Sequence, residues 1–160
     1  MRIERDDVTR PAVLALLEEH LRNMHELSPP EHVFAFDAGK LRAADVTFWT
    51  AWEGDSLAGC GALKALSSTA GEIKSMRTPA ARRGHGAGRA ILAHILQVAR
   101  ERGYRDLYLE TGNHPAFGPA QRLYERFGFR RCGPFADYEE NGSSVFMHLA
   151  LASPRATIGN

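Results

Sequence analysis

The segment 82–89, RRGHGAGR, limits what this chain can be more than any other part of its sequence. Glycine adopts left-handed backbone conformations at little cost, and it lets a ligand approach the backbone without obstruction by a Cβ atom. The segment follows a strand-like pattern and opens the strongest amphipathic helix pattern of the chain, at 86–102. A helix N-terminus carries unpaired N–H groups and a positive dipole end. Together with Arg82, Arg83 and Arg89, these features predict a cradle for a pyrophosphate.

Two familiar phosphate-binding loops do not match this segment. The P-loop requires a Lys followed by Ser or Thr after its glycines, and no such pair follows the glycines here. The dinucleotide fingerprint requires a third glycine at position 89, where this chain has Arg89. The candidate for its acidic ribose partner, Glu110, comes about six residues after the usual spacing of roughly 20. A nicotinamide-dependent oxidoreductase is therefore a disfavoured alternative.

Apolar periodicity and turn residues predict the remaining elements. Strands are expected at 1–5, 46–53, 57–66, 72–78, 106–110, 129–135 and 144–151, and helices at 8–24, 37–43, 86–102 and 119–127. Three consecutive strands are followed by strands that alternate with helices. This order predicts one mixed sheet with helices packed on its faces.

Composition and charge narrow the class of protein. The 160 residues are 44% hydrophobic and 24% charged, with a net charge of +1, which predicts one globular domain with a core. A near-neutral chain has no general attraction to nucleic acid or acidic membranes, and no apolar run is long enough to span a bilayer. The charged N-terminus does not resemble a signal peptide, so a cytoplasmic protein is expected. The domain is expected to span 1–151, followed by a loose tail at 152–160.

Cysteine and histidine are not arranged for metal binding. With only Cys60 and Cys132 present, the sequence predicts two reduced thiols that pack as small apolar residues. The seven histidines contain no H-E-x-x-H motif, and His20 and His25 are five residues apart, on different faces of their helix. No metal is therefore expected.

Two motifs carry a resemblance to a known family. Residues 83–88, Arg-Gly-His-Gly-Ala-Gly, match the pattern R/Q-x-x-G-x-G/A, and residues 123–129 read LYERFGF. With a strand and a proline-containing loop before the first motif, the chain resembles the GNAT N-acetyltransferase superfamily over about residues 46–151. The resemblance implies a GNAT-like α/β (α+β) fold, with a mixed, mostly antiparallel sheet of about six to seven strands and about four flanking helices. It also implies acetyl-CoA as co-substrate.

The resemblance assigns the acetyl-CoA contacts residue by residue. The backbone of the strand at 72–78 is expected to bind the pantetheine arm and to stabilise negative charge on the acyl oxygen, and the glycine loop is expected to bind the pyrophosphate. The side chain of His85 is expected to point to solvent while its backbone N–H contributes to the loop. The predicted cofactor-binding residues are Met76, Arg77, Thr78, Arg83, Gly84, His85, Gly86, Ala87, Gly88 and Arg89.

Two residues are candidates for acid–base catalysis. The resemblance places Tyr124 near the thioester sulfur, where a phenol can protonate a departing thiolate; a core tyrosine is the alternative. Glu72, at the start of the cofactor strand, is the candidate base that takes a proton from the attacking amine, with an exposed strand glutamate as the alternative. Further candidate bases are the carboxylates of Asp137, Glu139 and Glu140, but these are better explained as solvated charges of a loop than as catalytic groups.

The acceptor is less well defined by the sequence. His25, Trp49 and Tyr138 are the predicted substrate residues, and Phe34 and Phe36 are further aromatic candidates for the same pocket. Their character favours a small molecule with an apolar part, although core packing explains aromatic residues equally well. The family pattern is also altered at position 117: Phe117 stands where many relatives carry asparagine, and Asn113 lies earlier in an expanded loop.

The sequence therefore predicts an acetyl-CoA-dependent N-acetyltransferase. The expected reaction is direct attack, in a ternary complex, by a primary amine of a small molecule or amino-acid-like acceptor. A non-catalytic acyl-CoA-binding or sensory module on the same fold is the alternative. No nucleic acid or membrane partner is expected, and the oligomeric state stays open, with a homodimer as the common case.

Overall fold

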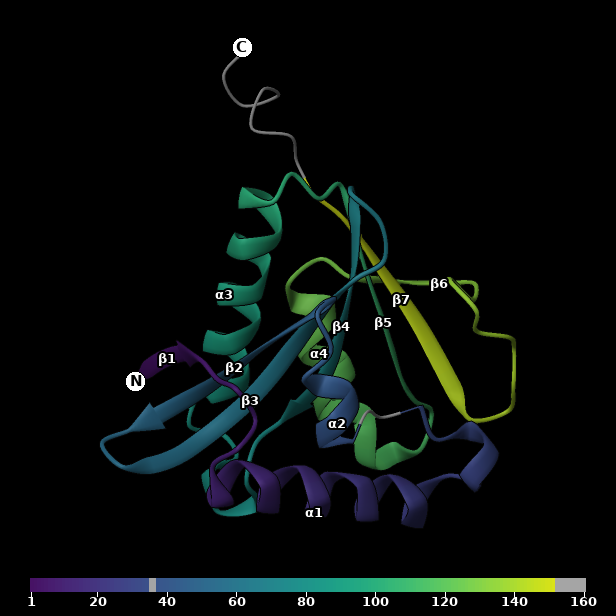
Figure 1. Ribbon diagram of the computed structural model, residues 1–160. Helices are drawn as coiled ribbons and strands as arrows, with labels where there is room; N and C mark the ends of the chain where they lie inside the picture. The colour runs from purple at the N-terminus through teal and green to yellow at the C-terminus, as the bar shows by residue number, and fades with distance from the viewer. Residues whose placement is uncertain (35–36, 152–160) are drawn as a thin grey trace.

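One mixed sheet of seven strands organises the chain, in the order β1-β2-β3-β4-β5-β7-β6 (Figure 1). The computed structural model describes residues 1–34 and 37–151, so Phe36 and the predicted tail at 152–160 lie outside the described residues. Neighbouring strands are antiparallel except β4 and β5, which run parallel, and the predicted mixed, mostly antiparallel sheet is thus confirmed. The strands are β1 (Arg2–Arg5), β2 (Val46–Glu53), β3 (Ser56–Ala65), β4 (Ala70–Arg77), β5 (Asp106–Gly112), β6 (Arg130–Cys132) and β7 (Ser144–Ala150).

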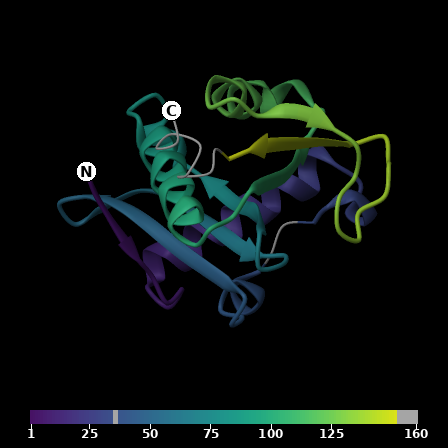
Figure 2. The same ribbon diagram turned by 90° about the horizontal axis from the view of Figure 1, so that it is seen from above.

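The helices of the described residues cover both faces of this sheet (Figure 2). Helices α1 and α2 lie on one face, and α3 and α4 lie on the other. None of them combines the length and the apolar character that crossing a membrane would need. The bounds are α1 (Pro11–Leu27), α2 (Ala38–Leu41), α3 (Ala87–Glu101) and α4 (Gly118–Arg126), with short 3-10 helices η1 (Pro30–His32), η2 (Ala80–Arg82) and η3 (Pro115–Phe117).

Each face of the sheet has its own apolar core. Val13 of α1 and Leu41 of α2 belong to the first core, and Ile91 of α3 belongs to the second. Strand β2 serves both, because successive side chains of a strand point to opposite faces: Phe48 faces the first core and Trp49 the second. Burial on both faces explains why the sequence of β2 reads as an almost continuous apolar run.

The predicted bounds differ from the observed ones by up to three residues, and two of the largest differences have a local cause. Helix α1 begins at Pro11 rather than at 8, because Val8 adopts a left-handed φ of 62° and its N–H donates to Asp6 Oδ1 at 2.8 Å. Strand β6 covers only Arg130–Cys132 rather than 129–135. The next residues, Gly133 and Pro134, end it because proline has no N–H to donate to a sheet.

Candidate functional site

Strands β4 and β5 diverge from one another in the middle of the sheet. Their parallel pairing runs from Ala70 and Asp106 to Ile73 and Leu109 and then stops, although both strands continue. Within β4, Ser75 has a positive φ of 55°, and the pairing of β3 with β4 shifts register at the same level. The sheet therefore opens into a wedge, and the backbone of residues 74–77 has no partner strand on the side of β5.

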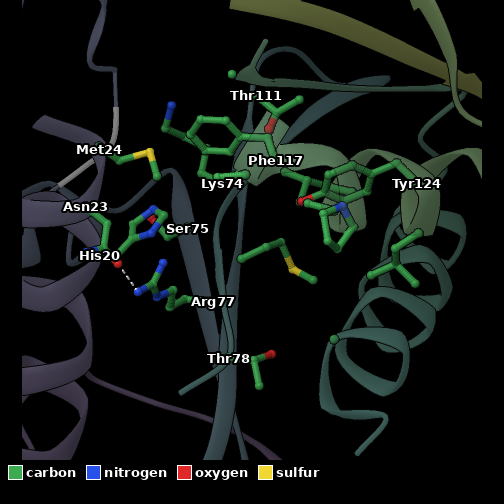
Figure 3. A pocket seen from close by; sticks show the side chains of 18 of the residues that line it. His20, Asn23, Met24, Lys74, Ser75, Arg77, Thr78, Thr111, Phe117 and Tyr124 are labelled. Carbon is green, nitrogen blue, oxygen red and sulfur yellow. Dashed lines mark hydrogen bonds between the residues drawn. The ribbon is translucent and has the colours of Figure 1, made fainter. Parts of the chain in front are cut away.

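A cavity of about 760 Å³ occupies this wedge. This volume lies within the roughly 300–1,000 Å³ of small-molecule sites. Its walls come from α1, from the divergent part of β4, from the glycine loop with the start of α3, and from α4. Figure 3 shows Arg77 and His20 on the α1 side of β4 and Tyr124 on the opposite side. The wedge thus offers two compartments, one on each side of β4.

The glycine loop forms one end of the cavity. Gly84 and Gly86 have φ values of 81° and 88°, and a Cβ atom added at either position would meet nothing within 4 Å. Gly86 is the N-cap of α3 and has no side chain to bond the first N–H groups of the helix. These N–H groups therefore begin α3 beside open space, with the exposed side chains of Arg83 and Arg89 close in sequence. An anionic phosphate fits this arrangement.

The predicted cofactor-binding residues lie together around this cavity. All of them line it except His85, whose side chain is exposed. The backbone segment that carries Met76 and Thr78 connects the wedge to the glycine loop. Arg82 also lines the cavity, but it forms an ion pair with Glu53 at 3.4 Å.

The LYERFGF motif encodes a helix end that positions Tyr124. Gly128 has a φ of 99°, and its N–H donates to the carbonyl of Glu125 at 3.0 Å. The N–H of Phe129 donates to the carbonyl of Tyr124 at 3.1 Å, which completes a Schellman motif. The rings of Tyr124 and Phe129 are in edge contact, with centroids 5.9 Å apart, as this motif favours. The helix end thus fixes both the depth and the direction of Tyr124.

Tyr124 belongs to the apolar core and also borders the cavity. Its side chain is 6% exposed, and it lines the cavity. Burial raises the pKa of its phenol well above the usual range, and the nearby carboxylate of Glu110 raises it further. The phenol therefore stays protonated at physiological pH and is able to donate its proton or a hydrogen bond.

Glu110 is a functional candidate that the sequence reasoning missed. It directly follows the part of β5 that pairs with β4, lines the cavity, and accepts a hydrogen bond from Ser144 Oγ at 2.7 Å. The pKa of its carboxyl is raised to about 7, mainly by burial. The hydrogen bond from Ser144 and the charge of Lys74 act in the opposite direction, and the charge of Glu72 raises the pKa further. Leu107 and Leu109 mark one face of β5 as buried, so Glu110 falls on the other face. That alternation was the available sequence signal.

Glu72 has a different environment, although it also lines the cavity. Its side chain is 3% exposed, and its Oε2 is 3.2 Å from Lys74 Nζ and accepts a hydrogen bond from the Tyr138 hydroxyl at 2.6 Å. Lys74 also donates to Tyr138 Oη and to the carbonyl of Phe34. Burial and the Glu72 carboxylate raise the pKa of Tyr138. Glu72 is thus the centre of a closed polar network, whereas Glu110 has one hydroxyl partner.

The predicted acceptor residues His25, Trp49 and Tyr138 all require correction, because none of them lines the cavity. Trp49 does not reach the cavity. It points into the core under α3, where its ring is in edge contact with that of His94, with centroids 5.4 Å apart. His25 is exposed and does not line the cavity, because the inner face of α1 passes through His20 instead. Phe34 does line it, and Tyr138 supports that wall through an edge contact with Phe34 at 5.1 Å.

The loop residues that the sequence singled out have separate positions. Phe117 lines the cavity and covers Gly112 so closely that a Cβ at Gly112 would lie 2.2 Å from its ring. Asn113 instead donates to the carbonyl of Gly142 at 2.5 Å, away from the cavity. The carboxylates of the β6–β7 loop are exposed and do not line it, namely Asp137, Glu139 and Glu140.

Within the part of the chain that the structure describes, no three His, Cys, Asp or Glu side chains are grouped so that they could hold a metal ion. Both cysteines are unpaired. Cys60 is fully buried beside β4, and burial raises the pKa of its thiol to about 12, so it is unreactive at neutral pH.

Comparisons with known proteins agree with this geometry. The family model of the acetyltransferase (GNAT) family matches residues 13–129. The chain is 53% identical to the uncharacterized N-acetyltransferase YsnE of Bacillus subtilis, over 94% of this chain and 100% of that protein. It is 48% identical to the uncharacterized N-acetyltransferase YedL of Escherichia coli, over 93% of this chain and 94% of that one.

Solved structures show the same fold. A crystal structure described as an acyl-CoA N-acyltransferase from Klebsiella pneumoniae superposes with a TM-score of 0.75 at 27% identity, covering 94% of this chain and 97% of that one. A GNAT family acetyltransferase from Elizabethkingia anophelis, solved with acetyl-CoA bound, has a TM-score of 0.66 at 16% identity, covering 94% and 97% of the two chains. The chain with the glycine loop and the divergent strands β4 and β5 therefore belongs to the GNAT family of acetyltransferases.

Proposed function

We propose that this chain transfers an acetyl group from acetyl-CoA to the primary amine of a small molecule or amino-acid-like acceptor, by direct attack in a ternary complex. The observation that carries the proposal is the cavity itself. It joins the glycine loop and the unpaired edge of β4 to the side chains of Glu110 and Tyr124. The loop would hold the pyrophosphate, and the backbone of 74–77 would hold the pantetheine arm. Acetyl-CoA, when bound, supplies an activated acyl carbon to the acceptor.

Glu110 is the general base in this proposal. A primary alkylammonium has a pKa near 10 and must lose a proton before its nitrogen can attack. A carboxylate with a pKa of about 7 is ionised in roughly half the molecules at pH 7, and it is a stronger base than an ordinary glutamate. Glu72 lies in the same cavity but is held by Lys74 and Tyr138. Glu72 therefore acts as a positioning residue that tunes the pKa of Glu110.

Tyr124 donates to the leaving sulfur. The amine first forms the C–N bond at the acyl carbon, and the C–S bond then breaks, so negative charge develops on the thiol sulfur and needs a donor. The second proton of the amine nitrogen, lost as the amide forms, replaces the proton that the phenol gives to the sulfur. The phenol is protonated and lines the cavity on the side of α4, opposite α1. Once Glu110 has taken the amine proton it is neutral, and its contribution to the raised pKa of Tyr124 disappears. The base thus makes Tyr124 a better donor when the thiolate leaves.

The glycine loop provides the direct test of acetyl-CoA binding. Replacing Gly86 by Val fills the open space at the start of α3 with a branched side chain. We expect the Kd for acetyl-CoA, measured by calorimetry, to rise at least tenfold, which corresponds to about 1.4 kcal/mol. For the wild type, acetyl-CoA at 100 times its Kd should stabilise the fold by about 2.7 kcal/mol, and NADPH should not.

Gly103 supplies the matched control for this variant. It has a similar φ, +79°, and equally open surroundings, but it follows α3 at the other end of the helix. Gly103→Val should therefore lower the melting temperature as much as Gly86→Val while the Kd for acetyl-CoA stays within twofold of wild type. Equal Kd values for the two folded variants would contradict the assigned pyrophosphate cradle.

Replacing Glu72 and replacing Ser144 should shift the pKa of Glu110 in opposite directions. Glu72 raises the pKa of Glu110, and the Ser144 hydrogen bond lowers it. We therefore expect the acid limb of the kcat/KM pH profile to shift to lower pH in Glu72→Gln and to higher pH in Ser144→Ala. The maximal rate should fall less than about tenfold in either variant, because neither side chain receives the proton. Shifts in one common direction, or a lost acid limb in Glu72→Gln, would make Glu72 the base instead.

A further inference from the structure

The wall formed by α1 and β4 contains an unusual group of polar atoms. Within residues 1–34 and 37–151, three buried side-chain nitrogen or oxygen atoms have no hydrogen-bond partner: His20 Nδ1, Ser75 Oγ and Arg77 Nε. Buried polar groups are nearly always bonded, so an orphaned atom calls for an explanation. All three belong to residues that line the same cavity, and Figure 3 shows their side chains on one side of β4.

Arg77 makes this wall electropositive. Its side chain is 11% exposed, and it reaches α1, where one terminal nitrogen donates to Asn23 Oδ1 and contacts Glu19 at 3.1 Å. Glu19 is 39% exposed, so water competes for its carboxylate. His20 is neutral at physiological pH, because burial and the adjacent Arg77 lower the pKa of its imidazole to about 4, so Arg77 supplies the positive charge beside it. The wall therefore contains the guanidinium of Arg77, and the Nε of this group has no acceptor.

We propose that this wall binds the carboxylate of the acceptor, and that the acceptor is an amino acid. The inference rests on the proposed function, because it names the substrate class of that same site. A carboxylate only accepts hydrogen bonds, and its planar shape matches the edge of a guanidinium. Arg77 Nε, the Ser75 hydroxyl and His20 Nδ1 can all donate, and the two oxygens of a carboxylate that enters from the cavity would accept from this group.

The proposed base, Glu110, lines the same cavity as this wall. The pairing of β4 with β5 ends at Ile73 and Leu109, directly before Glu110. Ser75 follows Ile73 by two residues, so Glu110 and Ser75 both lie just beyond the last paired residues of their strands and line the same cavity. In the proposed complex the amine of the amino acid faces Glu110 and its carboxylate faces the wall that contains Ser75. The cavity wall beyond them is mostly apolar, with Met24, Leu27, Val33, Phe34 and Phe117, and this favours an apolar side chain.

The test compares amino acids with the matching amines that lack the carboxylate. CoA release from acetyl-CoA is measured for the twenty L-amino acids, for their amides, and for the decarboxylated amines such as isoamylamine for leucine. We expect the best amino acid to exceed its amide and its decarboxylated amine at least thirtyfold in kcat/KM. In Arg77→Met this ratio should fall below about three, because the group that distinguishes the substrates is gone.

Glu19→Gln provides the control for a purely structural role of Arg77. This variant removes the ion pair that joins β4 to α1 but keeps the guanidinium. It should retain at least a tenfold preference for the amino acid. If Glu19→Gln loses the preference as completely as Arg77→Met, Arg77 only fixes α1 to β4, and the proposal is overturned. Should Arg77→Met not fold, Ser75→Ala and Arg77→Lys must each lower the same ratio for the proposal to stand.

The outcomes separate this inference from the proposed function. Equal turnover of amino acids and decarboxylated amines would overturn the carboxylate site but keep the acetyltransferase. Turnover of amines alone, or of neither series by a protein that binds acetyl-CoA, would likewise overturn the amino acid as acceptor. Failure of the wild type to bind acetyl-CoA would instead contradict the proposed function.

Discussion

Glu110→Gln should lower kcat about 100-fold or more at pH 7, within the range that a positioned general base contributes. The amide is close in shape to the carboxylate and can still accept the hydrogen bond from Ser144, but it cannot take a proton from the acceptor ammonium. In the wild type, kcat/KM should rise with pH through a midpoint near 7, the pKa of Glu110. In the variant this midpoint should disappear, and the loss should narrow towards pH 9.5, where free amine is abundant.

The same substitution, Glu110→Gln, should stabilise the fold at pH 8 although it lowers activity. The pKa of Glu110 is raised from 4.5 to about 7 in the folded protein, so the folded state binds more protons than the unfolded state between these values. The contribution of Glu110 to stability is thus present below pH 4.5 and is lost as pH rises through 7. Glu110→Gln should therefore melt at a higher temperature than the wild type at pH 8, with a smaller difference at pH 4.5.

These two readouts together separate catalysis from structure. A purely structural Glu110 would affect the melting temperature without moving the midpoint of the pH profile. Unchanged kcat in Glu110→Gln, with the midpoint near 7 retained, would mean that another group accepts the proton. The pH profile of Glu72→Gln would then become the deciding measurement, because Glu72 is the other buried carboxylate that lines the cavity.

The parts of the site that the sequence predicts well are those encoded by local backbone conformation. Gly86 and Gly128 both have a positive φ, and each marks a helix end that a few neighbouring residues determine. The glycine loop and the position of Tyr124 can therefore be read without knowing the rest of the fold. The single parallel pair of strands depends on the order of elements and is equally legible in outline.

The parts that depend on distant contacts could not be read in this way. The raised pKa of Glu110 comes from burial in the folded cavity, and its hydrogen-bond partner Ser144 lies 34 residues away. Trp49 was misassigned because both faces of β2 are buried in the apolar cores, and composition does not distinguish an aromatic residue of the core from one that lines a pocket. His20 did leave a signal: it continues the apolar stripe of α1 through Val13 and Leu17, where a polar residue is unexpected.

Tyr124→Phe is expected to produce the second large effect, a fall in kcat of about 100-fold. The substitution keeps the ring, so the contact with Phe129 and the helix end that surrounds it should remain. The free energy of unfolding should therefore change by no more than about 1 kcal/mol. The KM for acetyl-CoA should change much less than kcat, because the hydroxyl becomes important only as the sulfur gains charge.

The split between kcat and KM decides which role Tyr124 has. A large rise in KM at constant kcat would make it a binding residue for acetyl-CoA, and no change in either would make it a core tyrosine. Coupling to Glu110 gives a sharper criterion, because ionised Glu110 raises the pKa of Tyr124. If proton uptake by Glu110 prepares Tyr124 to donate, the double variant should lose less than the product of the two single losses. If the losses multiply, the two side chains act independently, and the proton taken from the amine does not assist departure of the thiol.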